Sequence, residues 1–227
     1  MTRKIFKRTT ISYHKPVAFI ITCALLFTTL PTLAFGSTEP ASEKAVITLD
    51  ESIKYDAAWK ALDLVNAERA KDGRSPLSMD SGLLKAAVTR AGEIALLFGH
   101  TRPDGSDWST TPELHKNAHI AENLAAGQPD PAAVVTGAHG WVNSAPHYKT
   151  LMDSKYKSTG IACIEIGGNK WWVQVFSSNE ADSVSKPANK NAQAKVSALT
   201  DNLNVSIVIS PKVAITGNTV GYSVVNR

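Results

Sequence analysis

Two histidines and one carboxylate are the residues of this chain whose types could do chemistry together. His100 directly follows a glycine, Glu122 lies between an alanine and an asparagine, and His147 directly follows a proline. Two neutral imidazoles can hold a divalent cation such as zinc, while a carboxylate either ligates the cation or fixes an imidazole tautomer. The two histidines lie too far apart in the chain for a local motif such as His-Glu-x-x-His, so tertiary folding must assemble any such site.

The first histidine follows two segments with helical periodicity. Apolar spacing predicts one helix that begins at an Asp56 cap and ends at Asp72-Gly73, and a second helix over residues 80–98. The glycine of Gly99-His100 ends the second helix, so His100 should lie just beyond its C-terminus. Residues 101–120 lack an apolar period and predict a loop, a kind of segment that often carries functional residues.

The second histidine follows a third predicted helix. Asp130-Pro131 supplies an N-cap and a proline for the first helical position, and the apolar side continues to Trp141. Ala145-Pro146 predicts a break directly before His147. We therefore expect this helix and its end to position the second imidazole.

The C-terminal part of the chain changes from helical to strand-like periodicity. Residues 160–166 and 170–176 predict two apolar strands joined by a hairpin turn at Gly167-Gly168-Asn169. Residues 179–201 are rich in Ser, Lys, Ala and Asn, which predicts a flexible linker. Residues 202–227 alternate apolar and polar side chains, which predicts a short β-rich C-terminal extension.

The N-terminus has the three-part composition of a secretory signal. Residues 1–36 contain a basic segment, an apolar run and small residues that suit cleavage after Ala34, followed by a leader over residues 37–54. The alternative is an uncleaved anchor, because residues 17–34 are about long enough to span a bilayer. Pro31 and the small residues after the apolar run favour cleavage, so we expect a secreted protein without a stable membrane span.

Charge and cysteine content limit the classes of partner and of fold. Residues 1–34 hold five of the 24 Lys and Arg and none of the 20 Asp and Glu, which leaves 19 basic and 20 acidic residues. A nearly neutral mature protein gives no support for nucleic-acid binding. Cys163 would be the sole cysteine left after cleavage, so no internal disulfide can form, and its apolar surroundings predict a buried strand thiol.

Eight short segments follow one another in the order found in one known family. They are Leu64-Val65-Asn66-Ala67-Glu68-Arg69-Ala70, Pro76-Leu77, Leu83-Leu84-Lys85-Ala86-Ala87, Gly99-His100-Thr101, Ala121-Glu122-Asn123-Leu124-Ala125, Trp141-Val142-Asn143-Ser144-Ala145-Pro146-His147-Tyr148, Thr159-Gly160-Ile161-Ala162 and Trp172-Val173-Gln174-Val175-Phe176. In this order they resemble the CAP superfamily (cysteine-rich secretory proteins, antigen-five and pathogenesis-related-one), in its bacterial SCP-like extracellular branch. The resemblance implies a mixed α/β (α+β) domain over residues 55–178, built as a three-layer α-β-α sandwich on an antiparallel sheet.

The resemblance also implies a cleft lined by two histidines and two acidic residues. His100 and His147 match the histidines and Glu122 matches one acidic position, but Ser144 stands at the second acidic position. With one carboxylate missing, we expect a ligand-binding cleft of His100, Glu122, Ser144 and His147 in which the two histidines bind zinc weakly. Without the resemblance, hydrogen bonds from each ring to backbone or to Glu122 would be a sufficient, purely structural role.

Several other residues have competing interpretations. His115 and His119 could supply further metal ligands from the loop, whereas His139 is expected at the surface or as core filler. Asn66 and Arg69 are expected to form a buried polar network that anchors the first helix to a loop. Trp141, Trp171 and Trp172 could form an aromatic wall for a ligand, but burial of Trp141 and of one strand tryptophan is the simpler expectation, because strand alternation places the other two on opposite faces.

These expectations leave three functions open. The first is a secreted module that binds a lipid, a cell-envelope component or a protein partner through the cleft. The second is a metal-dependent hydrolase in which Glu122 activates a metal-bound water beside His100 and His147. The third is a structural envelope or coat protein that docks through residues 202–227.

Overall fold

The computed structural model describes residues 18–22, 43–202, 205–208 and 221–226. A six-stranded sheet with the order β4-β6-β5-β2-β7 forms the centre of the domain, and β3 pairs with β5 beside this path. The neighbours along the path are antiparallel, whereas β3 and β5 are parallel. The strands are β2 (Lys44–Ile53), β3 (Ser78–Met79), β4 (Ile120–Ala126), β5 (Ser158–Ile166), β6 (Asn169–Ser177) and β7 (Lys190–Leu199).

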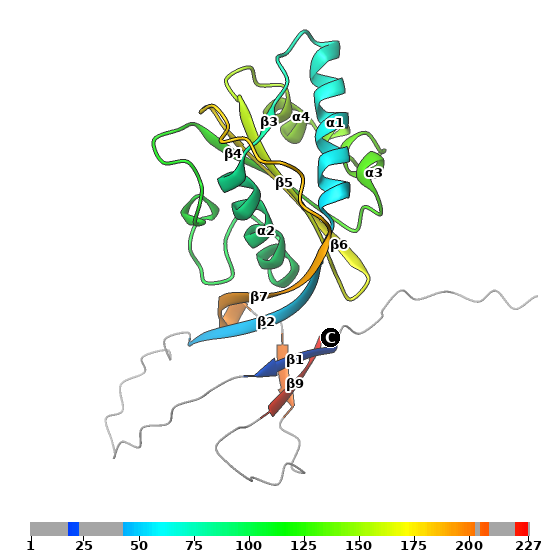
Figure 1. Cartoon of the computed structure of the whole chain (residues 1–227). Helices are drawn as coiled ribbons and strands as arrows, with labels where there is room; N and C mark the ends of the chain where they lie inside the picture. Colours follow the sequence, from blue (N-terminus) through cyan, green and yellow to red (C-terminus); the bar gives the residue numbers. More distant parts are fainter. Residues whose placement is uncertain (1–17, 23–42, 203–204, 209–220, 227) are drawn as a thin grey trace, which may run out of the picture.

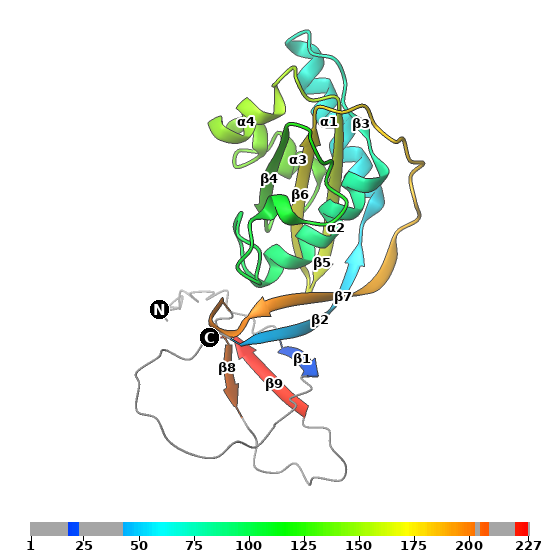
Figure 2. The same ribbon diagram turned by 90° about the vertical axis from the view of Figure 1, so that its left-hand side faces the viewer.

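Helices cover both faces of this sheet. Figures 1 and 2 show α2 on one face and α1 with α3 on the other, with the sheet between them. The predicted three-layer α-β-α sandwich is therefore confirmed. The helices are α1 (Tyr55–Lys71), α2 (Ser81–Leu96), α3 (Pro131–Val135) and α4 (Ala145–Leu151), and the 3₁₀ turns are η1 (Trp108–Thr110), η2 (Trp141–Asn143) and η3 (Thr200–Asn202).

Local capping explains where the two long helices begin and end. The Asp80 side chain caps α2 by accepting a hydrogen bond of 2.7 Å from the backbone N–H of Leu83. The predicted Asp56 cap of α1 is wrong, because the N-cap is Lys54 and Asp56 lies in the first helical turn. At the other end of α1, Gly73 has a positive φ of 64°, as expected for a residue that ends a helix.

The region before His147 differs from the predicted single helix. The helix α3 ends at Val135, and Trp141 lies in the separate 3₁₀ turn η2. Ala145-Pro146, predicted as a break, instead begins α4. Proline is tolerated in the first turn because its missing N–H would have no partner within the helix there. His147 therefore lies in the first turn of a helix rather than after one.

The hairpin β5–β6 confirms the turn that the sequence predicts. Gly167 and Gly168 connect the strands and both have positive φ values of 57° and 82°, the conformation that two-residue hairpin turns favour. Cys163 is fully buried on β5, and burial raises the pKa of its thiol to about 12, which confirms a buried strand thiol. Trp141 and Trp172 are buried as well, also as predicted.

Residues 37–54 were predicted to be a leader and residues 179–201 a flexible linker. This prediction is wrong for Lys44–Ile53 and Lys190–Leu199, which form the long strands β2 and β7. The strands β2 and β7 pair from Lys44↔Leu199 to Ile53↔Lys190, and β2 joins the central sheet through Ser52 and Ile53, which pair with β5. We call β2 and β7 the flanking ribbon; Figure 2 shows it running along the lower side of the domain, below α2. Composition suggested flexibility here, but every second side chain of β2 from Ile47 to Ile53 is buried, and so are Val196 and Ala198 of β7.

The proposed signal and the C-terminal extension are described only in part. Residues 1–17, 23–42, 203–204, 209–220 and 227 lie outside the described residues, so the signal peptide and its cleavage site stay predictions. A second sheet has the order β1-β9-β8, made by β1 (Ala18–Thr22), β9 (Gly221–Asn226) and β8 (Val205–Val208). Cleavage after Ala34 would remove β1 from that sheet. Within the described part of the chain, no helix is both long and apolar enough to cross a membrane.

Candidate functional site

A buried ion-pair network lies beneath the first predicted site residue. On α2, Arg90 Nη1 donates to Glu93 Oε2 at 2.8 Å, while Arg90 Nε donates to Glu122 Oε1 on β4 at 2.7 Å. The side chains of Arg90 and Glu122 are fully buried. Burial acts to lower the pKa of Arg90, but the hydrogen bonds and charges of Glu122 and Glu93 outweigh it and raise this pKa. The guanidinium is thus a fixed cation between two carboxylates.

The network continues into the loop after α2. Arg102 Nη2 donates to Glu93 Oε1 at 2.6 Å, and this hydrogen bond raises the pKa of Arg102. Arg90 Nη2 also donates to the carbonyl of Gly99 at 2.8 Å. Both contacts hold the loop close to the helix, which fixes the backbone on either side of His100.

His100 presents its ring above this network. Its Nδ1 lies 2.9 Å from Glu122 Oε2, and 58% of its side chain is exposed, whereas Glu122 is 0% exposed. Because Arg90 donates to both oxygens of Glu122, this carboxylate acts as an acceptor and favours a proton on Nδ1. In the neutral ring, the lone pair is then on Nε2. The expected contact between an imidazole and Glu122 is present for His100.

His147 reaches the same region from α4. Its backbone carbonyl accepts a hydrogen bond of 3.2 Å from the side chain of Asn123, the residue that follows Glu122 on β4. Burial, and then the charge of His100, lower the pKa of His147, so the two imidazoles lie within electrostatic range of each other. His147 therefore stays neutral to lower pH than an ordinary histidine.

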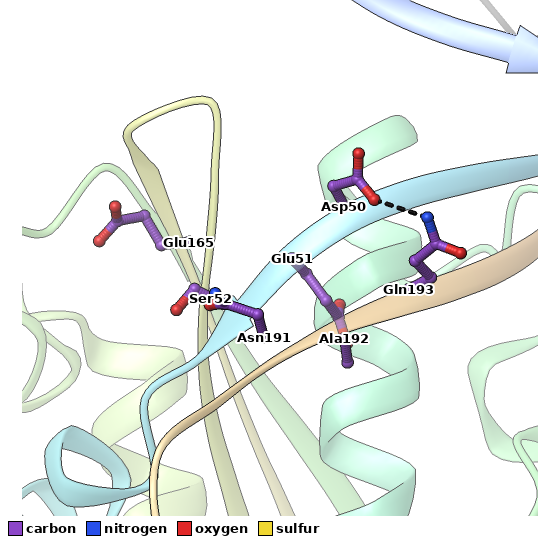
Figure 3. Close-up of a pocket in the computed structure, with 7 residues that line it drawn as sticks. All are labelled: Asp50, Glu51, Ser52, Glu165, Asn191, Ala192 and Gln193. Atoms are coloured by element: carbon purple, nitrogen blue, oxygen red, sulfur yellow. Dashed lines mark hydrogen bonds between the residues drawn. The ribbon is translucent and has the colours of Figure 1, made fainter.

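Ser144 lies at the start of α4, where the resemblance implies an acidic residue. Its backbone carbonyl accepts from the N–H of Tyr148 at 2.8 Å, but its hydroxyl makes no capping hydrogen bond. We call His100, Glu122, Ser144 and His147 the histidine site. A groove of about 520 Å³ lies elsewhere, along β2, β5 and β7, and none of these four residues lines it (Figure 3).

The histidine site offers few donor atoms to a metal ion. Nowhere in the described part of the chain do three or more His, Cys, Asp or Glu side chains converge as a metal site requires. Glu122 is buried, and Arg90 and His100 already contact its oxygens. Two imidazole nitrogens, from His100 and His147, are therefore the available protein donors.

The loop histidines have structural contacts of their own. His115 Nδ1 lies 2.9 Å from Ser177 Oγ, and its Nε2 lies 3.3 Å from Asp80 Oδ1. With both ring nitrogens engaged, His115 is not a further metal ligand, and that expectation is wrong. Asp80, His115 and Ser177 together supply the carboxylate, imidazole and hydroxyl of a catalytic triad. Ser177 is 0% exposed, however, so no substrate could reach its hydroxyl. The backbone of His119 pairs with Ser178, and His139 is exposed.

The predicted polar anchor on α1 is confirmed. The side chain of Arg69 is fully buried and donates to the carbonyls of Ser75 at 2.8 Å and Leu151 at 2.6 Å. Asn66 bonds both backbone groups of Leu77, donating to its carbonyl at 3.0 Å and accepting from its N–H at 2.8 Å. These contacts attach the loop after α1 and the end of α4 to the same helix.

Sequence reasoning missed Arg90, Glu93 and Arg102. Arg90 falls on the buried stripe of α2 that Leu83, Ala87 and Ile94 occupy, where an apolar side chain is usual. A charged residue on such a stripe, with an acidic residue three positions later, was the available signal. Its partner on β4 could not be identified from the sequence.

Comparison with known proteins agrees with the fold. Residues 62–176 match the CAP family, described as the cysteine-rich secretory protein family, and because this match covers half of the chain, the chain belongs to that family. A curated relative, the uncharacterized protein YkwD of Bacillus subtilis (strain 168), is 32% identical over 147 residues, which are 62% of this chain. Those residues cover 55% of YkwD, so the chain spans about half the length of that relative.

Two solved structures are similar to this chain at lower identity. An extracellular protein containing a SCP domain from Bacillus anthracis str. Ames has a TM-score of 0.46 at 23% identity, over 54% of this chain and 40% of that protein. An outer surface protein from Borrelia burgdorferi has a TM-score of 0.49 at 20% identity, over 56% of this chain and 96% of that protein.

Proposed function

We propose that this CAP protein is a secreted binding module whose histidine site takes up a lipid, another cell-envelope component or a protein partner and holds a divalent cation weakly. The observation that carries the proposal is the contact of His100 with Glu122, which Arg90 fixes from below. This contact leaves the lone pair of His100 on Nε2, in a ring that is exposed. The second imidazole, His147, has a lowered pKa and stays neutral. Zinc bound there would supply open coordination positions for oxygen atoms of a ligand.

The same contact argues against the metal-dependent hydrolase. A base for a metal-bound water must reach that water directly, or through one further water. Glu122 is fully buried, and it would have to leave Arg90 in order to act. Ser144 supplies no second carboxylate. Binding without turnover is therefore the function that the site supports better.

Zinc titration by calorimetry tests the metal part of the proposal. We expect weak one-site binding to the wild-type protein that disappears in His100→Ala and in His147→Ala. His139→Ala is the matched control, because it removes an exposed imidazole away from the site, and it should bind as the wild type does. Circular dichroism checks that each variant is folded. Equal binding in His147→Ala, or none in the wild type, would refute a metal site at these histidines.

Ligand binding and secretion are tested separately. Co-sedimentation with phosphatidylglycerol vesicles and with purified peptidoglycan should retain the wild-type protein on one of them, and His100→Ala should reduce retention. Retention on neither would refute lipid and peptidoglycan as ligands. The exported protein should begin after Ala34 by N-terminal sequencing, whereas a full-length chain in the membrane fraction would support the alternative of an uncleaved anchor.

A further inference from the structure

The flanking ribbon lies outside residues 62–176, the part that matches the family, yet it packs closely on the family domain. One face of the ribbon is apolar and buried, and this face turns toward α2. Its buried side chains are Ile47, Leu49, Val196 and Ala198. At the far end, the N–H of Leu199 donates to the carbonyl of Pro103 at 2.8 Å, which fastens the ribbon to the loop after α2.

One carboxylic acid interrupts this apolar face. Glu51 follows the same alternation as Leu49 and Ile53, lies opposite Ala192 of β7, and is 6% exposed. Figure 3 shows its side chain on the opposite side of β2 from the carboxyl group of Asp50. Its Oε2 is buried and has no hydrogen-bond partner among the described residues.

The carboxyl group of Glu51 lies against α2. A Cβ placed on Gly92 of α2 would lie 3.6 Å from Glu51 Oε2 and 3.5 Å from the Cβ of Ala194. Gly92 of α2 therefore lies directly against the carboxyl group and against β7, because an added Cβ would be in van der Waals contact with both. A charged oxygen at an apolar contact without a donor is strongly unfavourable, whereas a protonated carboxyl is much less so.

The charged groups around Glu51 do not compensate for its burial. Burial raises the pKa of Glu51 to about 7, while the charge of Lys190 on β7 acts in the opposite direction. On α1, the pKa of Tyr55 is raised by burial and then by Glu51. The charged residues next to Gly92 on α2 bond other partners: Arg90 donates to Glu122, and Glu93 accepts from Arg102.

On the β5 side, the charged groups near the ribbon pair with each other. Glu165 of β5 pairs with Ser52, whose side chain lies on the face opposite to that of Glu51. It also forms an ion pair of 3.5 Å with Lys54. Among the described residues, the contact with α2 therefore holds no cation that bonds to Glu51 Oε2.

We propose that Glu51 is a pH-dependent latch of the flanking ribbon: the protonated side chain lets the ribbon dock on α2, and its ionisation releases the ribbon. Release would uncover Leu49 and Val196 and would break the contact between Leu199 and Pro103. Pro103 directly follows Arg102, whose contact with Glu93 supports the network under His100. Undocking would thus loosen the loop that carries His100.

The sign and size of the effect follow from the two pKa values of Glu51. The released side chain has the ordinary value of 4.5 and the docked one a value of about 7. Below pH 4.5 both states are protonated, so docking is strongest there. Between pH 4.5 and about 7 only the docked state keeps the proton, and the docking constant falls about tenfold per pH unit, up to roughly 300-fold.

Hydrogen exchange of the full chain tests the latch. The backbone amides of β2 and β7 are followed between pH 5 and 8, corrected for intrinsic exchange rates, with those of β5 and β6 as an internal reference. In the wild type, protection of the ribbon should fall roughly 40-fold between pH 5 and 7 relative to the reference. In Glu51→Gln, which keeps the shape of the side chain but cannot ionise, protection should not depend on pH.

Asp50→Asn is the matched control. It removes the same charge from the neighbouring position of β2, where the side chain is exposed and bonds Gln193, so its ribbon should follow the pH dependence of the wild type. Protection of the wild-type ribbon that is constant with pH, or an unchanged pH dependence in Glu51→Gln, would overturn the proposal. If Glu51→Gln does not dock, Glu51→Met replaces it, and its docking should likewise be independent of pH.

Discussion

Replacing Arg90 by methionine is expected to lower the free energy of unfolding by about 3–5 kcal/mol, because it leaves buried charges without their partner. The side chain of Arg90 is fully buried and donates to Glu122, Glu93 and the carbonyl of Gly99. Glu93 keeps Arg102, but Glu122 keeps only His100. Most of the loss should therefore come from Glu122. For a domain of this size, it corresponds to a fall in Tm of roughly 6–20 °C.

Urea denaturation followed by tryptophan fluorescence measures this loss. Lys85→Met is the matched control, because it removes an exposed cation from the same helix, and it should change stability by less than about 0.5 kcal/mol. The double variant Arg90→Met, Glu122→Leu should recover part of the loss, since both members of the buried pair become apolar. A loss below about 1 kcal/mol in Arg90→Met would refute the buried network as described.

Three further predictions follow from other contacts. Gly160→Ala should prevent folding or cost about 3 kcal/mol or more, measured by denaturation, because its Cβ would lie 2.1 Å from backbone atoms of Leu83; wild-type stability would contradict this packing. Cys163 should resist thiol reagents at pH 8 until the protein unfolds, because it is fully buried and its thiol has a pKa of about 12; rapid labelling of the native protein would disprove its burial. By NMR titration, His147 should have a pKa below 6.5, and His100→Ala should raise it only in part, because burial is the larger cause; an unchanged value would show that the rings do not interact. Since the unfolded chain then binds a proton at His147 before the folded one does, this group should reduce stability as the pH falls below about 6.5.

Local chemistry in the sequence by itself determined several features of the fold. The Asp130 cap of α3, the Gly167-Gly168 turn and the C-terminal Gly73 of α1 each act within a few residues, so the sequence alone locates them. The order of the eight short segments indicated the CAP family and its sandwich, and the family match confirms it. The burial of Cys163 followed from its apolar neighbours in the same strand.

Contacts between distant segments were decided by the tertiary structure alone. Lys44 and Leu199 pair at the end of the flanking ribbon, although most of the chain lies between them. Composition alone had predicted a leader and a linker for their two segments. Arg90 likewise bonds Glu122 across the interface of α2 and β4, which makes Glu122 a buried support for His100. Caps, turns and periodicity act between near neighbours in the chain, whereas the partner of a strand edge or of a buried charge depends on which groups the folded layers bring together.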